Sequence, residues 1–169
     1  NRLSLQNPIH DLADALRKDD VYDPEVIGNL YYAALMADIR GFQRPTVNTI
    51  QDSTIILRSI AFHTIRNTPR LPEMFRDLMK EHPKFDASFV FTADIEHRRK
   101  RLEKRMRETP EQVSVEDMMV INKPEKFLAM EACLVDVARA NLGSMVIDTS
   151  QLSPEQVVSM MQSNVPQIR

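Results

Sequence analysis

The stretch that decides the fold is Ala87-Ser88-Phe89-Val90-Phe91-Thr92, which runs directly into Ala93-Asp94 and a strongly charged segment. An apolar run with little polarity is typical of a strand that is covered on both faces. Asp94 then predicts the N-cap of a helix over residues 95–107. A second run, Ser144-Met145-Val146-Ile147-Asp148-Thr149, is followed by the capping box Ser153-Pro154-Glu155-Gln156. Strand followed by helix, twice, predicts a parallel sheet in an α/β domain.

Working outward, the same pattern extends towards the N-terminus. Thr46-Val47-Asn48-Thr49-Ile50 reads as a third strand, and residues 2–6 as a fourth. Asp23 followed by Pro24 opens a helix that ends near Gly41, and Gly143 marks the end of another. Further helices are expected over residues 53–66, 72–81 and 124–141. The sequence therefore predicts one helix-rich α/β domain over residues 1–169, a parallel sheet flanked by helices.

The composition narrows the function classes. The 169 residues include 22 Lys or Arg and 24 Asp or Glu, so a bulk polyanion binder is not expected. One cysteine, Cys133, excludes an internal disulfide framework and fits a reducing compartment, so we expect a cytoplasmic protein. No apolar run reaches the ~18 residues of a membrane span. The chain starts with Asn1 and shows no signal-peptide pattern, so we expect a processed product or a fragment.

Glycine is scarce, and this bears on phosphate binding. The three glycines, Gly28, Gly41 and Gly143, lie far apart in the sequence. A phosphate-cradling loop needs several glycines within a few residues, so none is present in these 169 residues.

The most distinctive local signal is the basic run at residues 97–107, in which seven of eleven side chains are Lys or Arg. Grouping this much positive charge is unfavourable unless an anion offsets it, which favours a phosphate-binding surface. One alternative is a solvated helix face with Glu96, Glu103 and Glu108 as partners. Another is a nucleic-acid patch, although the run has no interleaved aromatic residues for base stacking.

A carboxylate stands where a predicted strand meets a predicted helix. Asp52 follows the run that ends at Ile50, and Arg58 lies about a turn and a half further on. Ligands of open α/β sheets sit beyond the carboxyl ends of the strands, so Asp52 is a candidate to accept a proton or reach a hydrated metal ion. The alternative is a plain helix N-cap by Asp52 or Ser53.

A stripe on the helix predicted over residues 24–41 recurs every four residues, as Tyr32, Met36 and Arg40. This face offers flat or soft surface and then a forked cation, which can hold a base or a sugar. The alternative is a core stripe that ends in an arginine reaching solvent. The histidines have no ligand spacing, so no metal cluster is expected around them.

Taken in order, these segments resemble the thymidylate kinase and deoxynucleoside kinase branch of the P-loop kinases. Val146-Ile147-Asp148-Thr149-Ser150-Gln151, with the Ser153 capping box, looks like the last strand and helix of thymidylate kinases. Residues 89–105 look like the strand and arginine-rich helix that lead into that family's lid, here about residues 107–123. The resemblance implies a three-layer sandwich that lacks the family's first strand and phosphate loop, and it implies ATP and Mg²⁺ as cofactors.

Together with the stripe on the helix predicted over residues 24–41, the resemblance implies a role for each candidate residue. Asp52 would act as a base or as a ligand of Mg²⁺-bound water, and Arg58 would hold the acceptor. Three arginines would close over the transferring phosphoryl group: Arg99, Arg101 and Arg105. ATP would be bordered by Arg98, Ser150 and Gln151, and the nucleoside by Tyr32, Met36, Arg40, Phe62 and His63. Three positions depart from the family pattern, because Ser53, Asn7 and His63 stand where Arg, a carboxylate and Gln are usual.

The sequence therefore predicts a phosphotransferase that moves the γ-phosphoryl group of ATP to a nucleoside or nucleoside monophosphate, provided a phosphate loop comes from an upstream segment or a second chain. The alternative is a non-catalytic, kinase-like binding or regulatory module, because tight ATP binding needs backbone amides around the phosphates. A third hypothesis, RNA binding through residues 97–107, predicts steep salt dependence. The expected partner is a small nucleoside or nucleotide rather than a membrane or a nucleic acid, and a homodimer is left open.

Overall fold

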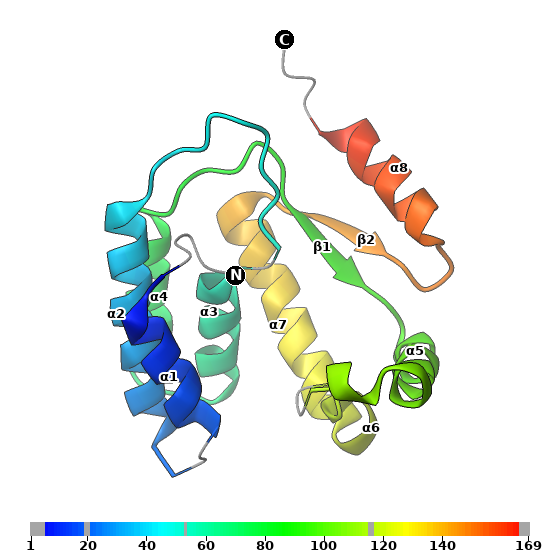
Figure 1. Cartoon of the computed structure of the whole chain (residues 1–169), viewed down its shortest axis with the longest axis horizontal. Helices are drawn as coiled ribbons and strands as arrows, with labels where there is room; N and C mark the ends of the chain where they lie inside the picture. Colours follow the sequence, from blue (N-terminus) through cyan, green and yellow to red (C-terminus); the bar gives the residue numbers. More distant parts are fainter. Residues whose placement is uncertain (1–5, 19–20, 53, 115–116, 166–169) are drawn as a thin grey trace. The chain divides into compact units, whose positions relative to one another are not determined.

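The computed structural model describes residues 6–18, 21–52, 54–114 and 117–165. The chain divides into two compact units, Asn1–Lys84 and Phe85–Arg169 (Figure 1). The chain is helix-rich with a small parallel sheet, which is compatible with the expected α/β fold. The three-layer sandwich and the single domain stay predictions. Over the described ranges, no helix is long and apolar enough to cross a bilayer.

The described part of the first unit consists of helices: α1 (Pro8–Lys18), α2 (Pro24–Gly41), α3 (Ile55–Ile65) and α4 (Leu71–Met79). The predicted start of α2 is confirmed, because the Asp23 side chain accepts a 2.7 Å hydrogen bond from the Glu25 backbone N–H. The helices predicted over residues 53–66 and 72–81 are confirmed as α3 and α4, with shifted ends.

Helix α1 was not predicted, although Asn7 and Pro8 carry the signal for it. The Asn7 side-chain oxygen accepts from the backbone N–H of Ile9 at 3.1 Å and so caps the helix. Its amide donates to the Ala34 carbonyl at 2.9 Å and to Asp38 at 2.7 Å, both on α2. The buried Asn7 therefore fixes α1 against α2, and a carboxylate at this position could not make the two donor contacts.

The core between α2, α3 and α4 is built around Phe75, which is fully buried. The Tyr32 ring meets Phe75 edge-on at 5.6 Å between centroids, and His63 stacks on it at 5.9 Å. The Phe62 ring meets His63 at right angles at 5.1 Å. Aromatic pairs of these geometries add to the energy of apolar burial, so this cluster holds the three helices together.

The strand predicted over residues 46–50 is wrong. The segment between α2 and α3 contains no strand in its described part, and Val47 and Ile50 are 73% and 89% exposed. β-branched residues favour a strand only where a neighbouring strand and a packed face await them, and this segment has neither. The other strand expected near the N-terminus, residues 2–6, lies outside the described residues except for Gln6, which belongs to no helix or strand.

The described part of the second unit contains two strands, β1 (Phe89–Thr92) and β2 (Met145–Asp148). Between them lie α5 (Ile95–Glu108), the 3-10 turn η1 (Pro110–Gln112), α6 (Met119–Asn122) and α7 (Pro124–Leu142), and α8 (Pro154–Asn164) follows β2. The predicted caps are confirmed: Asp94 for α5, Gly143 at φ 59° for α7, and the complete capping box at Ser153 for α8.

The two strands pair in parallel, as predicted, with Phe89 opposite Met145 and Thr92 opposite Asp148. The hydroxyls of Ser88 and Ser144 hydrogen-bond at 2.7 Å where the pair begins. Among the described residues, no further strand pairs with the outer edge of β1 or β2. The register places the carboxyl ends of both strands at the same end of the sheet, and the loops that follow them lie there too.

The tight contact at Gly28 yields a first prediction. A Cβ added there would lie 2.5 Å from Leu71 Cδ1 and 2.6 Å from His63 Nε2, whereas a Cβ at Gly41 of the same helix meets nothing within 4 Å. Gly28→Ala is therefore expected to lower the free energy of unfolding by about 1–3 kcal/mol, despite the better helix propensity of Ala. Gly41→Ala is the control, with no loss expected. Urea denaturation measures both, and equal effects would contradict the packing.

The buried His63 yields a second prediction. Burial lowers the pKa of His63 to about 4, and the Arg66 charge adds to this. The unfolded ring, with a pKa of ~6.5, binds its proton first as the pH falls, so stability is greatest above pH ~6.5 and declines towards pH 4, by about 3 kcal/mol.

In His63→Asn this share of the slope should disappear, although absolute stability also falls because the stacking on Phe75 is lost. His82, whose pKa burial also lowers, provides the comparison as His82→Asn. Denaturation curves between pH 4 and 7.5 test this, and a slope unchanged by His63→Asn would show that the buried ring is not the titrating group.

Candidate functional site

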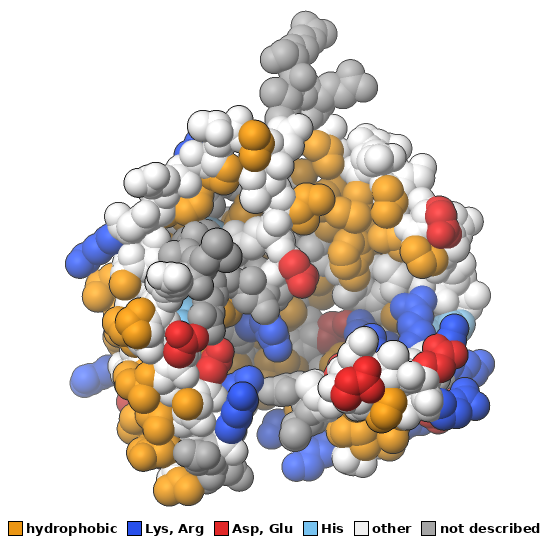
Figure 2. Space-filling view, viewed as in Figure 1, with side chains coloured by type: hydrophobic (Ala, Val, Ile, Leu, Met, Phe, Trp, Pro, Cys, Tyr) orange, Lys and Arg blue, Asp and Glu red, His pale blue; other side chains and the backbone are white. Residues whose placement is uncertain are grey.

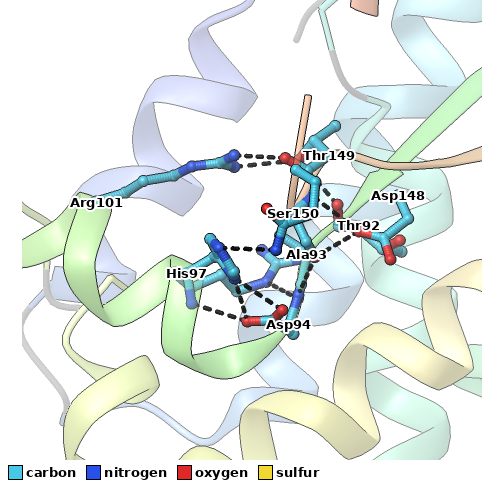
Figure 3. A network of polar contacts seen from close by, with 10 residues as sticks. Thr92, Ala93, Asp94, His97, Arg101, Asp148, Thr149 and Ser150 are labelled. Carbon is cyan, nitrogen blue, oxygen red and sulfur yellow. Dashed lines mark hydrogen bonds and ion pairs between the residues drawn. The ribbon is translucent and has the colours of Figure 1, made fainter. Parts of the chain in front are cut away.

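Polar side chains converge where β1 and β2 end (Figure 3). In α/β proteins this edge of a parallel sheet is where ligands bind. The residues come from the loop after β1, the first two turns of α5, the last position of β2 and the loop that follows it. We call this group the strand-end cluster: Asp94, His97, Arg101, Asp148, Thr149, Ser150 and Gln151.

Hydrogen bonds join the two loops directly. The Thr149 backbone N–H and hydroxyl both donate to the Thr92 carbonyl, at 2.8 and 2.9 Å. The Ser150 hydroxyl accepts from the Asp94 backbone N–H at 2.8 Å and donates to Asp148 at 2.5 Å. This hydroxyl and the Ser150 backbone N–H lower the pKa of Asp148. Ser150, predicted to border ATP, therefore links the loop after β1 to the loop after β2.

His97 bridges the same two loops and was missed as a site residue by the sequence analysis. Its ring Nδ1 lies 2.8 Å from both carboxylate oxygens of Asp94, and its Nε2 lies 3.2 Å from Gln151 Nε2. The backbone N–H of His97 and then its ring lower the pKa of Asp94. The available signal was spacing: an N-cap carboxylate with a histidine three residues later places both on one helix face.

Arg101 reaches from α5 to the loop after β2. Its guanidinium donates to the Thr149 carbonyl at 2.5 Å and to the Thr149 hydroxyl at 3.1 Å. The side chain is exposed, so part of the guanidinium fork still faces solvent. The structure thus brings together three predicted site residues, Arg101, Ser150 and Gln151, at one edge of the sheet.

Arg98, predicted to border ATP, is engaged inside the unit. It donates to the Ala93 carbonyl at 2.8 Å, pairs with Glu131 of α7, and lies over the Phe127 ring at 5.0 Å. The Arg98 and Glu131 side chains are 21% and 17% exposed. Burial raises the pKa of Glu131, although the Arg98 charge opposes it. In this arrangement Arg98 fastens α5 to α7.

Arg99 and Arg105 form exposed ion pairs. Arg99 pairs with Glu96 at 3.0 Å, and Arg105 pairs at 3.6 Å with Asp117, in the lid-like segment of residues 107–123. Basic side chains gather over α5 with acidic side chains between them (Figure 2). Exposed pairs contribute only about 0–1 kcal/mol, so an incoming phosphate can replace either carboxylate.

The candidate residues of the first unit fall into two groups. Tyr32, Phe62 and His63 belong to the aromatic cluster around Phe75, and His63 also lines a pocket of about 240 Å³. The packing of Tyr32 on Phe75 agrees with the alternative that the stripe on α2 is core. The stripe continues through the half-buried Met36 to the exposed Arg40.

Asp52 and Arg58 are both exposed. The N-cap position of α3 is Thr54, whose side chain makes no capping hydrogen bond, so the alternative of Asp52 as a plain cap is wrong. Ser53 lies outside the described residues. Within the part of the chain that is described, no group of three His, Cys, Asp or Glu side chains is placed to hold a metal ion.

The role of Arg98 can be tested against that of its neighbour. Arg98→Met leaves Glu131 half-buried without its cation, so the free energy of unfolding should fall by about 2–3 kcal/mol. Arg99→Met removes an exposed pair from the same helix and should cost less than about 1 kcal/mol. Chemical denaturation measures both variants. Two equally small losses would show that Arg98 is available for a ligand rather than committed to α7.

Comparisons with known proteins add no assignment to this arrangement. No protein-family model, no curated protein and no solved structure matches the chain. The interpretation of the strand-end cluster therefore depends on its own geometry and chemistry.

Proposed function

We propose that this chain is a kinase-like protein that binds a nucleotide at the strand-end cluster. With a phosphate loop from an upstream segment or a second chain, it would transfer the γ-phosphoryl group of ATP to a nucleoside or nucleoside monophosphate. The observation that supports this is the convergence of Arg101, Ser150 and Gln151 at the carboxyl ends of two parallel strands. This is the edge of an α/β sheet at which nucleotides characteristically bind.

The chemistry of the cluster suits a nucleotide in two parts. Gln151 and Ser150 offer amide and hydroxyl groups to a base or a sugar. The exposed guanidinium of Arg101 offers a forked donor to a phosphate, and Arg105 follows one turn later, about 6 Å along α5. Base and phosphate groups of one nucleotide would thus find partners on the same side of the second unit.

Phosphoryl transfer depends on positioning and on neutralising charge, so the proposal assigns Arg99, Arg101 and Arg105 to the transferring group. The ion pairs of Arg99 and Arg105 are exposed and weak enough to be exchanged for phosphate oxygens. Arg98 stays with Glu131 and acts through the placement of α5. Arg→Lys at these sites would not restore a forked contact.

The roles that the resemblance implies for the acceptor fall on residues of the first unit, and they stay predictions. Asp52 would accept the proton of the acceptor or hold Mg²⁺ through a water, and Arg58 would hold the acceptor. One carboxylate suits Mg²⁺ only when nucleotide phosphates supply the other ligands. The nucleoside contacts assigned to Tyr32, Met36, Arg40, Phe62 and His63 would require entry beside the aromatic cluster.

A second candidate is a non-catalytic, kinase-like binding or regulatory module. It is favoured by the partners of the arginines: each of Arg98, Arg99, Arg101 and Arg105 already contacts a carboxylate or a carbonyl of the same unit. The 169 residues also contain no glycine-rich loop. Such a module would not bind ATP tightly, because it lacks backbone amides around the phosphates, and it would not turn ATP over.

Titration of the 169-residue chain with a fluorescent ATP analogue and Mg²⁺ tests the binding. Arg101→Met is expected to weaken affinity about 10-fold or more, the value of a charge-assisted contact of ~1.5–3 kcal/mol. The control is Arg107→Met, which removes the same charge from an exposed position of α5. Among the described residues, the Arg107 side chain hydrogen-bonds only to the Glu103 carbonyl.

Equal losses in the two variants would indicate general attraction to the basic helix instead of a site. No binding of ATP, ADP or nucleosides at low salt would overturn the proposal, and steeply salt-dependent binding of an RNA oligonucleotide alone would favour the third hypothesis. ATP turnover with nucleoside acceptors, measured on the chain together with the upstream segment or second chain that supplies a phosphate loop, then separates the two candidates, because the module does not turn ATP over.

A further inference from the structure

Asp94, His97 and Gln151 form a hydrogen-bonded chain through the strand-end cluster. Figure 3 shows Asp94 and His97 facing each other in it. Asp94 Oδ1 accepts the backbone N–H of His97 at 2.8 Å, as the N-cap of α5. Both carboxylate oxygens also lie 2.8 Å from the ring Nδ1. An ionised carboxylate only accepts hydrogen bonds, so Nδ1 must carry the ring hydrogen.

In a neutral ring, this fixes what the other nitrogen can do. In a neutral imidazole with hydrogen on Nδ1, the Nε2 atom is an acceptor. It therefore needs a donor, and the Gln151 amide nitrogen at 3.2 Å supplies one. The direction of donation runs uniformly from Gln151 to His97 to Asp94. The chemistry of the neighbours thus assigns the orientation of the Gln151 amide.

The amide oxygen of Gln151 is thereby turned away from His97. Gln151 is exposed, and among the described residues no hydrogen bond is made by its Oε1. If the ring hydrogen stood on Nε2, the Gln151 amide would have to turn round. A ring with hydrogen on Nε2, whether as the other tautomer or doubly protonated, presents a donor to Gln151, which must then offer its oxygen inward and its NH₂ group outward.

We propose that Asp94 and His97 are positioning residues that set the orientation of the Gln151 amide, so that its oxygen faces a bound nucleobase. An outward oxygen accepts from the exocyclic amino group of adenine or cytosine, whereas an outward NH₂ donates to the keto oxygen of guanine or uracil. The choice of base rests on the proposed function, but the orientation of the amide does not. One such hydrogen bond is expected to give about 3- to 10-fold preference.

Other charged groups also face this ring. Asp148 interacts electrostatically with both Asp94 and His97, and Arg101 lies on the next turn of α5. Neither forms a hydrogen bond with the ring, so both change its charge balance without setting which nitrogen carries the hydrogen. The tautomer therefore depends on Asp94.

We call the chain of donation from Gln151 to His97 to Asp94 the relay. Asp94→Asn is expected to reverse it with little change in shape. The oxygen of the new amide can keep the backbone N–H of His97, because Asn is as good an N-cap as Asp. The NH₂ group of that amide then faces the ring Nδ1, which must become an acceptor and move the hydrogen to Nε2. Gln151 should turn its amide in response. Asp136→Asn, an exposed site on α7, is the charge-matched control.

Two measurements follow. Imidazole ¹⁵N NMR spectra report which ring nitrogen carries the hydrogen, and competition binding reports the affinity ratio of ATP to GTP. The wild type and Asp136→Asn should show the Nδ1–H tautomer and favour ATP about 3- to 10-fold, and Asp94→Asn should show Nε2–H with the preference lost or reversed. If Asp94→Asn does not fold, the wild type is compared at alkaline pH and at an acid pH at which the spectra show a doubly protonated ring. The ATP preference should then fall at the acid pH.

A wild-type Nε2–H tautomer, or a tautomer unchanged in Asp94→Asn, would overturn the relay. A reversed tautomer with an unchanged ATP-to-GTP ratio would overturn the assignment of base selection to Gln151. Absence of any nucleotide binding would refute the proposed function and base selection with it, and the NMR result would still decide the relay on its own.

Discussion

The second unit depends on the parallel pairing of two four-residue strands, Phe89–Thr92 and Met145–Asp148. Because the pairing is parallel, both chains leave the sheet at the same edge, and the Thr149 amide and hydroxyl bond to the Thr92 carbonyl there. The contacts that join the loop after β1 to the loop after β2 depend on that register. A shift by one residue would turn Ile147, which is buried, to the other face and remove Ser150 from Asp94.

The basic helix α5 shows how a chain tolerates dense positive charge. Arg98 is half-buried and held by Glu131, the Ala93 carbonyl and the Phe127 ring, so it serves the packing of α5 on α7. Arg99 and Arg105 have exposed carboxylate partners, which compete only weakly with a stronger anion. The same run thus contains one arginine that serves packing and others that can exchange their partners for a ligand. The pattern of charges in the sequence does not distinguish the two kinds.

Nucleotide binding and the orientation of the Gln151 amide are different properties of the strand-end cluster. Nucleotide binding depends on what the exposed groups offer to a ligand. The relay through Asp94, His97 and Gln151 depends on how hydrogen atoms are arranged inside the protein, because a carboxylate at one end leaves each following group a single role. A helix cap can in this way govern the polarity of a side chain on another loop.

Local chemistry in the sequence determined the helix starts at Asp23, Asp94 and Ser153, the stop at Gly143 and both paired strands, because caps and short apolar runs act over a few residues. The family resemblance, rather than local chemistry, singled out Arg101, Ser150 and Gln151, and the structure places them near one sheet edge. Only the tertiary structure decided that residues 46–50 form no strand, that Arg98 belongs to Glu131, and that His97 joins two loops. Those outcomes depend on partners far away in the sequence, and a strand without a neighbour or a charge without its counter-charge cannot be recognised from nearby residues.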